Sequence, residues 1–512
     1  MRLALLATAA LLAAPAQAAE LRYASTSDPT TLDPHAGNSA PVFSLLGNVY
    51  EGLVRRGRDM SIEPALATSW EPIGEGEGWR FALREGVTFH DGAAFDAEDV
   101  IFSYERASSE EADTRSWFAG VTRVEAPDPL TVEIYTDAPN PIFPDSIANW
   151  MMMDSGWAAE NGAERPNIEG GNFATTNANG TGPYMVVSRQ PGLSTELAAW
   201  EGWWDEGRGN VTEAIFQPVQ NSATAVAALL SGELDLIEPV PVQDAARLDG
   251  APDVQVIRGI EARVIMIGFP HDAETLVGGG ENVFADPAVR LAVAQAINVP
   301  AILQTVMRGS AEEATQLVSP AMRGFTASLE RPAYDVEAAR AAIEAAGAAG
   351  ATVSLKCPND RYLNDEAVCT AITAMLAQAG LDPQLDTMPV AQYWPELRSP
   401  EHDLYLLGWS PGTFDAEHPI RFLAATPDEE ARLGSWNFGG YSNARVDELL
   451  PMIQSEIDDA ARQAMLDEVA AILAEETAYV PLYVQPLLWG AKDGIEIVQR
   501  PDNFIVLRWI EM

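Results

Sequence analysis

Apolar and polar positions alternate over part of the chain with the two-residue period of strands. Residues 79–84 (WRFALR) place Trp79, Phe81 and Leu83 on one face, and residues 131–135 alternate in the same way. Both segments are therefore predicted as half-buried strands. The region around them is predicted to consist of short strands joined by turns.

Helical periods occur where capping residues also mark the ends. Asp286-Pro287 supplies an N-cap and a proline at the first helical position, and Gly232 and Gly347 are typical of the residue after a helix. Helices are therefore expected over 42–53, 96–107, 222–231, 335–346 and from 286 onward, with strands over 21–24 and 234–237.

Strand and helix patterns alternate most regularly between residues 352 and 409. Strands at 353–355, 384–387 and 403–407 are separated by helices at 365–379 and near 393–398. This order predicts a parallel sheet with right-handed crossovers. Because ligands of such sheets bind beyond the carboxyl ends of strands, two loops are candidates for a binding site. They are residues 357–364, with Arg361, and residues 408–418, with Asp415.

The first eighteen residues differ from the rest of the chain. Arg2 precedes an apolar stretch that is too short to span a bilayer comfortably, and Ala16-Gln17-Ala18 forms an A-x-A cleavage site. This order predicts a secretory signal peptide over residues 1–18, although a buried helix is the alternative. The mature protein is expected to begin near Ala19 and to be periplasmic.

Composition and charge narrow the class of protein. The chain has 512 residues, enough for several domains, and its 47% hydrophobic content indicates a globular fold. Its formal net charge of −44 repels nucleic acid and anionic lipid, so neither is expected as a partner. An acidic surface alone names no substrate.

Cys357 and Cys369 are the two cysteines of the chain. In an exported protein they favour one disulfide between a strand end and a helix, with two buried free thiols as the alternative. Two cysteines without a nearby histidine do not form a zinc site.

The sequence GWSPG at residues 408–412 has the G-x-S-x-G pattern of a serine-hydrolase elbow. An elbow uses the backbone N–H of the residue after the serine, but here that residue is Pro411, which has no N–H. Proline also favours extended backbone at Ser410. A secreted serine hydrolase therefore remains a weak alternative, and no enzymatic step is expected.

The sequence contains no clear pattern for a metal site or a nucleotide site. Asp415, Glu417 and His418 could together form a metal site, but a solvated loop is the commoner outcome for such a group. There is no phosphate-binding loop pattern. No cofactor is therefore predicted.

Several blocks along the mature chain resemble the family 5 extracellular solute-binding proteins of ABC importers, the dipeptide-, oligopeptide- and nickel-binding group. The blocks are residues 31–35, 50–53, 64–67, 89–92, 99–100, 179–184, 232–235, 286–292 and 441–447.

The resemblance implies an α/β fold with two lobes joined by a hinge, of the type II, cluster C periplasmic binding proteins, with an extra subdomain. One lobe then combines residues 19–50, 180–270 and 480–512. The extra subdomain covers residues 51–179, and the second lobe covers residues 271–479.

The resemblance also suggests ligand-binding residues. Asp415 matches the position that pairs with a peptide's amino group, and Arg361 is the best match for the arginine that pairs with its carboxylate. Trp409 is expected to stack on the ligand, and Asn38 and Ser39 lie in a loop that contacts ligand in relatives. Asp415 as a turn cap, Arg361 in a surface ion pair and Trp409 in the core are the alternatives.

Together these observations predict a monomeric periplasmic binding protein that captures di- or oligopeptides between its lobes. It would deliver them to the permease and ATPase subunits of an ABC importer. Within the same class, a nickel chelate, an opine, an oligosaccharide or glutathione are the alternative ligands.

Overall fold

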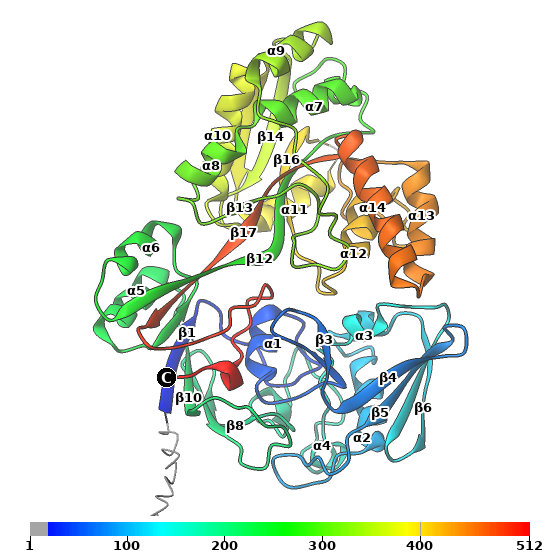
Figure 1. The fold of residues 1–512 in the computed structure, drawn as a ribbon, viewed down its shortest axis with the longest axis vertical. Coiled ribbons are helices and arrows are strands. Elements are labelled where there is room, and N and C mark those ends of the chain that lie inside the picture. The colour runs from blue at the N-terminus through cyan, green and yellow to red at the C-terminus, as the bar shows by residue number, and fades with distance from the viewer. Residues whose placement is uncertain (1–18, 400) are drawn as a thin grey trace, which may run out of the picture.

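The computed structural model describes residues 19–399 and 401–512, so the predicted signal peptide lies outside the described residues. The chain forms two lobes and a smaller subdomain (Figure 1). One mixed sheet runs through both lobes in the order β15-β14-β16-β12-β17-β11-β1-β10-β9-β8, with the short β13 paired to β17.

Lobe I contains the N-terminal strand and the C-terminal end of the chain. Its elements are β1 (Ala19–Ser25), α1 (Ala40–Leu46), β8 (Tyr184–Gln190), β9 (Ser194–Ala199), β10 (Val211–Pro218), α5 (Ser222–Ser231), β11 (Leu236–Glu238), α6 (Val242–Asp249) and the 3-10 turn η5 (Leu507–Trp509). β1 pairs in parallel with both β10 and β11. This central position agrees with the burial of Leu21 and Tyr23.

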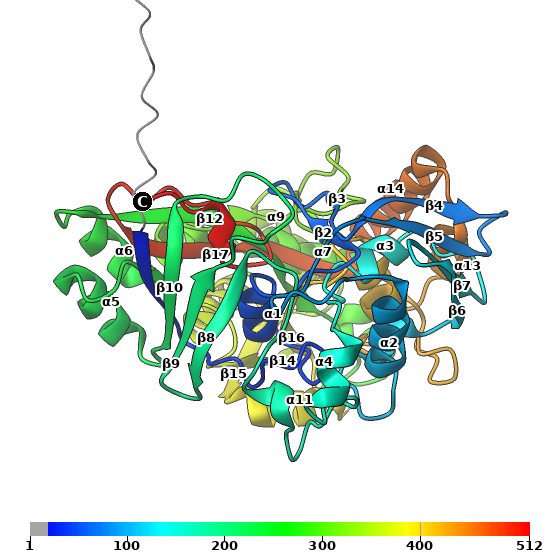
Figure 2. The same cartoon turned by 90° about the horizontal axis from the view of Figure 1, so that it is seen from below.

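The extra subdomain has a hydrophobic core of its own, centred on Phe81, Phe89 and Trp150. It lies at the opposite end of the molecule from α5 and α6 (Figure 2). Its elements are β2 (Val54–Arg56), β3 (Ile62–Pro64), β4 (Ala67–Ile73), β5 (Gly78–Leu83), α2 (Ala97–Ala107), η1 (Arg115–Phe118), β6 (Val121–Asp128), β7 (Thr131–Thr136), α3 (Phe143–Ser146), α4 (Ser155–Glu160) and η2 (Phe173–Thr175).

Lobe II confirms the strand–helix alternation predicted between residues 352 and 409. β14 pairs in parallel with both β15 and β16. The elements are η3 (Val283–Ala285), α7 (Pro287–Ala296), α8 (Val299–Thr305), β13 (Glu312–Glu313), α9 (Val336–Ala345), β14 (Thr352–Pro358), α10 (Asp365–Gln378), β15 (Asp382–Met388), α11 (Val390–Arg398), β16 (Leu404–Trp409), α12 (Glu417–Pro419), η4 (Ile420–Ala424), α13 (Ala444–Ser455) and α14 (Asp459–Glu475).

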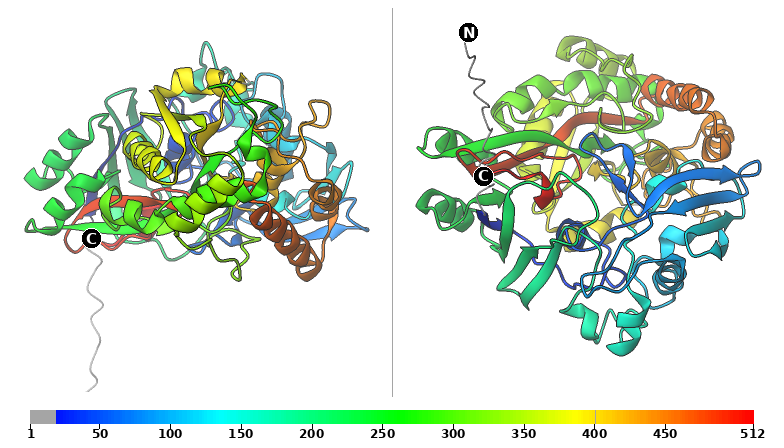
Figure 3. Two further views of the ribbon diagram at one scale, coloured as in Figure 1. Left: turned by 90° about the horizontal axis from the view of Figure 1, so that it is seen from above. Right: turned by 60° about the horizontal axis from the view of Figure 1, so that its bottom comes forward.

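Two long antiparallel strands, β12 (Val254–Gly268) and β17 (Tyr479–Lys492), connect the lobes. They run side by side from one lobe into the other (Figure 3). Their regular pairing is interrupted between Ile260 and Val264, where three residues of β12 lie opposite Gln485 alone. Such a bulge bends a strand. The two strands therefore bend between the lobes, and the lobe boundaries after residues 270 and 479 stay a prediction.

The predicted helix over residues 42–53 ends earlier, because α1 stops at Leu46 and the chain then pairs with another segment. The N–H groups of Gly182 and Tyr184 donate to the carbonyls of Val49 and Asn48 at 2.9 and 3.0 Å. A Cβ at Gly180 would lie 2.0 Å from the Val49 carbonyl oxygen. This close approach explains the two glycines of residues 179–184.

His90 joins the same segment to the subdomain. The Gly180 N–H donates to Nδ1 of His90 at 3.2 Å, and Nε2 of His90 lies 3.0 Å from the Gly182 carbonyl oxygen. Nδ1 therefore accepts and Nε2 carries the proton. Burial lowers the pKa of His90, so the ring stays neutral in this role.

A disulfide joins Cys357, at the end of β14, to Cys369 in α10. The loop that it closes contains Arg361, so the bond holds both ends of a candidate binding loop.

Replacing both cysteines by serine is expected to lower the free energy of unfolding by about 3 kcal/mol, because the cross-link restricts the unfolded chain. Urea unfolding of the wild type with and without reductant, compared with the double variant, measures this. A reduced wild type as stable as the oxidised protein would contradict it.

Candidate functional site

A cavity of about 410 Å³ lies where the sheet passes from lobe I to lobe II. Its volume is within the range of small-molecule sites. Its walls come from both lobes and from the two connecting strands. The polar and aromatic residues that line it are Tyr23, Ser25, Thr26, Ser27, Ser44, Phe216, Glu238, Glu261, Arg263, Arg361, Gln485, Trp489, Asp502 and Asn503.

The bulge between β12 and β17 places a charged pair on the cavity wall. The guanidinium of Arg263 donates to Glu261 at 2.9 Å, and Gln485 donates to the same carboxylate at 2.6 Å. Although burial opposes it, the attraction to Glu261 raises the pKa of Arg263. Gln485 also accepts from the N–H of Leu363, at 3.3 Å. The bulge is thus hydrogen-bonded to the loop that carries Arg361.

Arg361 lines the cavity from lobe II and is exposed. Its backbone N–H donates to Asp365 at 2.9 Å. Its guanidinium lies over the ring of Tyr362, at 5.3 Å. Among the described residues the guanidinium has no hydrogen bond or ion pair with a protein acceptor. Its planar fork is therefore available for a carboxylate.

Lobe I faces the two arginines with acceptors. Glu238 accepts from the amide of Asn503 at 3.1 Å, and burial raises the pKa of its carboxyl, with a further contribution from Glu261. The hydroxyl of Tyr23 is buried without a hydrogen-bond partner among the described residues. The cavity thus offers both donors and acceptors to a ligand with groups of both charges.

Asp415 has partners within lobe II. Its two carboxylate oxygens each accept from Arg462 of α14 at 2.8 Å, and one also accepts from the N–H of Glu417. Asp415 is 0% exposed and Arg462 is 1% exposed. The carboxylate therefore holds its own loop against α14, and the structure does not direct it into the cavity.

Trp409, at the end of β16, packs in an aromatic group outside the residues that line the cavity. Its indole N–H donates to Nδ1 of His418 at 3.2 Å, and its ring lies 5.6 Å from that of Trp436 and 5.7 Å from that of Phe422. The side chain is half-buried, so one part of it still faces outward.

Asn38 and Ser39 lie at the edge of the cavity, before its lining residues Ala40 and Pro41. The Asn38 backbone and side-chain amides donate to Asp113 at 2.8 and 3.3 Å, and Ser39 is the N-cap of α1. The structure gives both residues roles in the loop, and leaves a contact with ligand as a prediction.

The residues considered for metal binding do not converge. Nδ1 of His418 accepts from Trp409, while burial and nearby Arg421 lower the pKa of the imidazole to about 3. Glu417 accepts from Gln454 at 2.7 Å. Within residues 19–399 and 401–512, no group of three or more His, Cys, Asp or Glu side chains could hold a metal ion.

The segment after Ser410 is a turn in which the Phe414 N–H donates to the Pro411 carbonyl at 3.2 Å. The next helix is the three-residue α12. A nucleophile elbow passes directly from strand to helix, so this geometry differs from an elbow.

In the described part of the chain, no helix is both long and apolar enough to cross a membrane.

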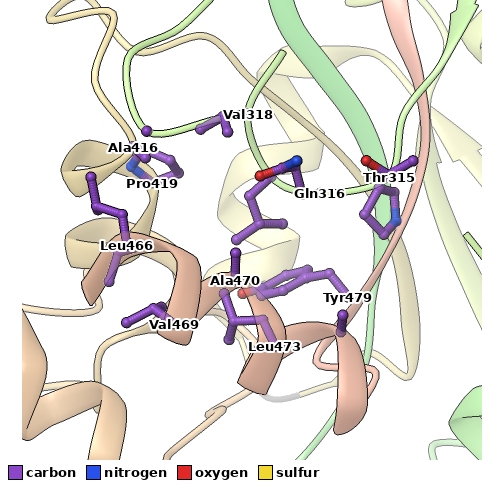
Figure 4. Close-up of a pocket in the computed structure, with 15 residues that line it drawn as sticks. Thr315, Gln316, Val318, Ala416, Pro419, Leu466, Val469, Ala470, Leu473 and Tyr479 are labelled. Atoms are coloured by element: carbon purple, nitrogen blue, oxygen red, sulfur yellow. The ribbon is translucent and has the colours of Figure 1, made fainter. Parts of the chain in front are cut away.

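A second, apolar cavity lies inside lobe II and is too small for a peptide, at about 50 Å³. Figure 4 shows Leu466, Val469 and Leu473 of α14 facing Ala416 and Pro419 across it. It is a packing gap beside the Asp415 loop.

Sequence reasoning missed Glu238, Glu261, Arg263 and Gln485. A signal was present for two of them, because Glu261 and Arg263 interrupt the apolar run of β12. Charged residues beside the buried half of a strand, here Ala262 and Val264–Gly268, indicate either an ion pair or a site.

Residues 61–429 match the family model "Bacterial extracellular solute-binding proteins, family 5 Middle". A glutathione-binding protein, GsiB of Escherichia coli O1:K1, is 26% identical over 492 residues, which are 94% of this chain and 92% of GsiB.

Solved structures agree with the fold. HbpA2 from Haemophilus parasuis superposes with a TM-score of 0.84 at 21% identity, covering 96% of this chain and 99% of HbpA2. DppA from Helicobacter pylori, in complex with the peptide STSA, gives 0.73 at 21% identity, covering 96% and 98%. The predicted two-lobed α/β fold is confirmed.

Replacing Asp415 by asparagine is expected to lower the free energy of unfolding by about 3–5 kcal/mol, because Arg462 would keep a buried charge without its partner. Urea unfolding measures this. Glu468→Gln is the matched control, since it removes one carboxylate from the exposed pair with Arg445 and should change stability little. Equal effects of the two variants would contradict a special role for the buried pair.

Proposed function

The chain belongs to family 5 of the bacterial extracellular solute-binding proteins, and we propose that it captures a short peptide or peptide-like zwitterion in the cavity between its lobes. The family membership confirms the resemblance seen in the sequence. The observation that carries the ligand class is the unpaired guanidinium of Arg361 opposite the carboxylates of the cavity.

A zwitterion fits this arrangement because its carboxylate needs a planar donor and its ammonium group needs acceptors. Arg361 supplies the donor and Glu238 supplies an acceptor, whereas Glu261 is already paired with Arg263 and Gln485. This proposal moves the ammonium partner away from Asp415, whose carboxylate is occupied by Arg462. Asp415 instead acts as a positioning residue for the loop after Trp409.

Binding in this cavity would be coupled to closure of the lobes. Its walls belong to both lobes, so a bound ligand gains contacts with both only when they approach. The bulge at Glu261 and Gln485 is the larger of two interruptions in the regular pairing of the two strands, the other falling between Ile265 and Met266. We propose it as the hinge, with the closed form delivering ligand to the permease and ATPase subunits of an ABC importer. The proposed protein is a monomer exported to the periplasm.

Among peptides, glutathione is the specific candidate that the relatives favour, because GsiB is a glutathione-binding protein. Its free carboxylates and amino group match the charges of the cavity. A nickel chelate, an opine and an oligosaccharide are the other ligands to compare. An oligosaccharide would leave Arg361 without a charged partner, so the cavity favours it least.

Replacing Arg361 by alanine is expected to weaken the binding of a dipeptide or glutathione by about 2 kcal/mol, or roughly thirtyfold in Kd, because a charge-assisted hydrogen bond is lost. Titration calorimetry with glutathione, dialanine, a nickel–histidine complex and an opine measures this and ranks the ligands.

Two controls make the test specific to the carboxylate. Arg398→Ala removes an exposed lobe II arginine that does not line the cavity and should leave the affinity unchanged. A dipeptide with an amidated C-terminus should bind weakly to the wild type and equally weakly to Arg361→Ala. If Arg361→Ala weakens the affinity for the amidated and the free dipeptide by the same factor, Arg361 does not hold the carboxylate.

A further inference from the structure

A separate cavity in lobe I and the subdomain is lined by four arginines. It has a volume of about 80 Å³, which is room for several water molecules or one small oxyanion. Its walls are α1, β2, the loop at residues 148–151 and the C-terminal segment. The arginines are Arg55, Arg56, Arg500 and Arg508. In a chain of net charge −44, this is a local concentration of positive charge.

Three of the arginines each have an aspartate partner. The contacts are Arg55 Nη2 to Asp205 Oδ2 at 2.7 Å, Arg56 Nη1 to Asp145 Oδ1 at 3.4 Å, and Arg500 Nε to Asp502 Oδ1 at 3.1 Å. These pairs neutralise the charges of three arginines and leave the fourth arginine without an aspartate partner.

Arg508 is the fourth, and among the described residues its guanidinium has neither a hydrogen bond nor a carboxylate oxygen within 4.0 Å. It lies near two indole rings, 4.5 Å from the centroid of Trp509 and 6.0 Å from that of Trp203. Burial, and then the neighbouring Arg55, lower its pKa to about 10. The side chain therefore remains charged at neutral pH with its N–H groups unpaired.

Other donors around the cavity are also unsatisfied. Three arginine nitrogens of this cavity are buried without a hydrogen-bond partner within the described chain: Nε and Nη1 of Arg55 and Nε of Arg56. Arg56 as a whole is only 6% exposed. The carboxylate oxygens nearest to the two Arg55 nitrogens are those of Glu63, at 3.7 Å, and Glu51, at 4.0 Å.

Glu51 also lines the cavity, but its oxygens are already bonded. They accept from the hydroxyl of Thr181 and from the indole N–H groups of Trp203 and Trp204, at 3.1, 3.2 and 2.7 Å. Burial raises the pKa of this carboxyl. The Glu51 carboxylate thus already has three donors, and it forms no ion pair with Arg508 within 4.0 Å.

We propose that this cavity is a second binding site, which takes one small oxyanion, a phosphate or a carboxylate, on Arg508 and Arg55. An oxyanion supplies the acceptors that the buried N–H groups lack, and it removes the cost of leaving them unpaired. The planar guanidinium, 4.5 Å from the Trp509 ring, presents a fork of donors that suits this contact. A site for a free anion does not depend on the proposed function, because none of the four arginines lines the cavity between the lobes. A site for an acidic group of the captured solute rests on it.

The oxyanion has two possible sources. It is either a free anion from the medium or an acidic group of the captured solute, since the two cavities share Ser44 and Ile505 as lining residues. The chemistry of recognition is the same for both, and separate probes distinguish them.

The test measures binding of inorganic phosphate to the mature chain by calorimetry and thermal shift, with sodium chloride adjusted to keep ionic strength constant. The wild type is expected to bind phosphate saturably, and Arg508→Gln to bind it at least about tenfold more weakly. Arg398→Gln is the matched control, because it makes the same charge change at an arginine over Trp436 but away from the cavity. Arg508→Lys should restore part of the affinity.

A second arm measures glutathione with the same variants. Weaker glutathione binding by Arg508→Gln identifies the oxyanion as a carboxylate of the solute, whereas an effect on phosphate alone identifies a free anion. The site is overturned if wild type and Arg508→Gln do not differ with either probe, or if Arg398→Gln reduces binding as much as Arg508→Gln.

Discussion

The antiparallel pairing of β12 with β17 is the constraint on which the rest of the structure depends. These two strands carry the sheet from one lobe into the other, and each lobe adds its remaining strands to their outer edges. The backbone N–H and C=O groups of both strands must be hydrogen-bonded along the whole length of the strands. The path of the two strands from one lobe to the other is therefore set by the places where their regular pairing is interrupted. The pairing is interrupted at residues 261–263, opposite Gln485, and again between Ile265 and Met266. The charged side chains of the first interruption, Glu261 and Arg263, are among those that line the cavity between the lobes.

Much of the fold could be predicted from the sequence, because its signals are local. The caps at Asp96, Asp286 and Asp335 each accept a hydrogen bond from the first turn of the predicted helix. The family blocks also have physical explanations as scaffold contacts. His90 bonds to the segment with Gly180 and Gly182, and Arg290 donates to four backbone carbonyls. The end of α1 could not be predicted, because it is set by pairing with residues far along the chain.

The residues of the proposed site were harder to predict for the same reason. The loop with Arg361 could be proposed from the sequence because it follows a strand of a parallel sheet. Glu238, Glu261 and Gln485 come from three distant segments, β11, β12 and β17, which meet at the cavity only in the folded chain. The partner of Asp415 lies 47 residues away on α14, and no local pattern indicates that pairing. Buried arginines recur in this acidic chain, and each of those in the described residues has a carboxylate or carbonyl partner. Arg508 is half-buried and has neither among the described residues.

The central claim is that the chain captures a zwitterionic solute between its lobes. Native mass spectrometry of the mature protein, purified from its own source without unfolding, tests this most directly by identifying what remains bound. The account predicts a single small solute per chain that carries both a carboxylate and an amino group. A co-purifying solute that lacks either charge, such as a neutral sugar, would contradict it.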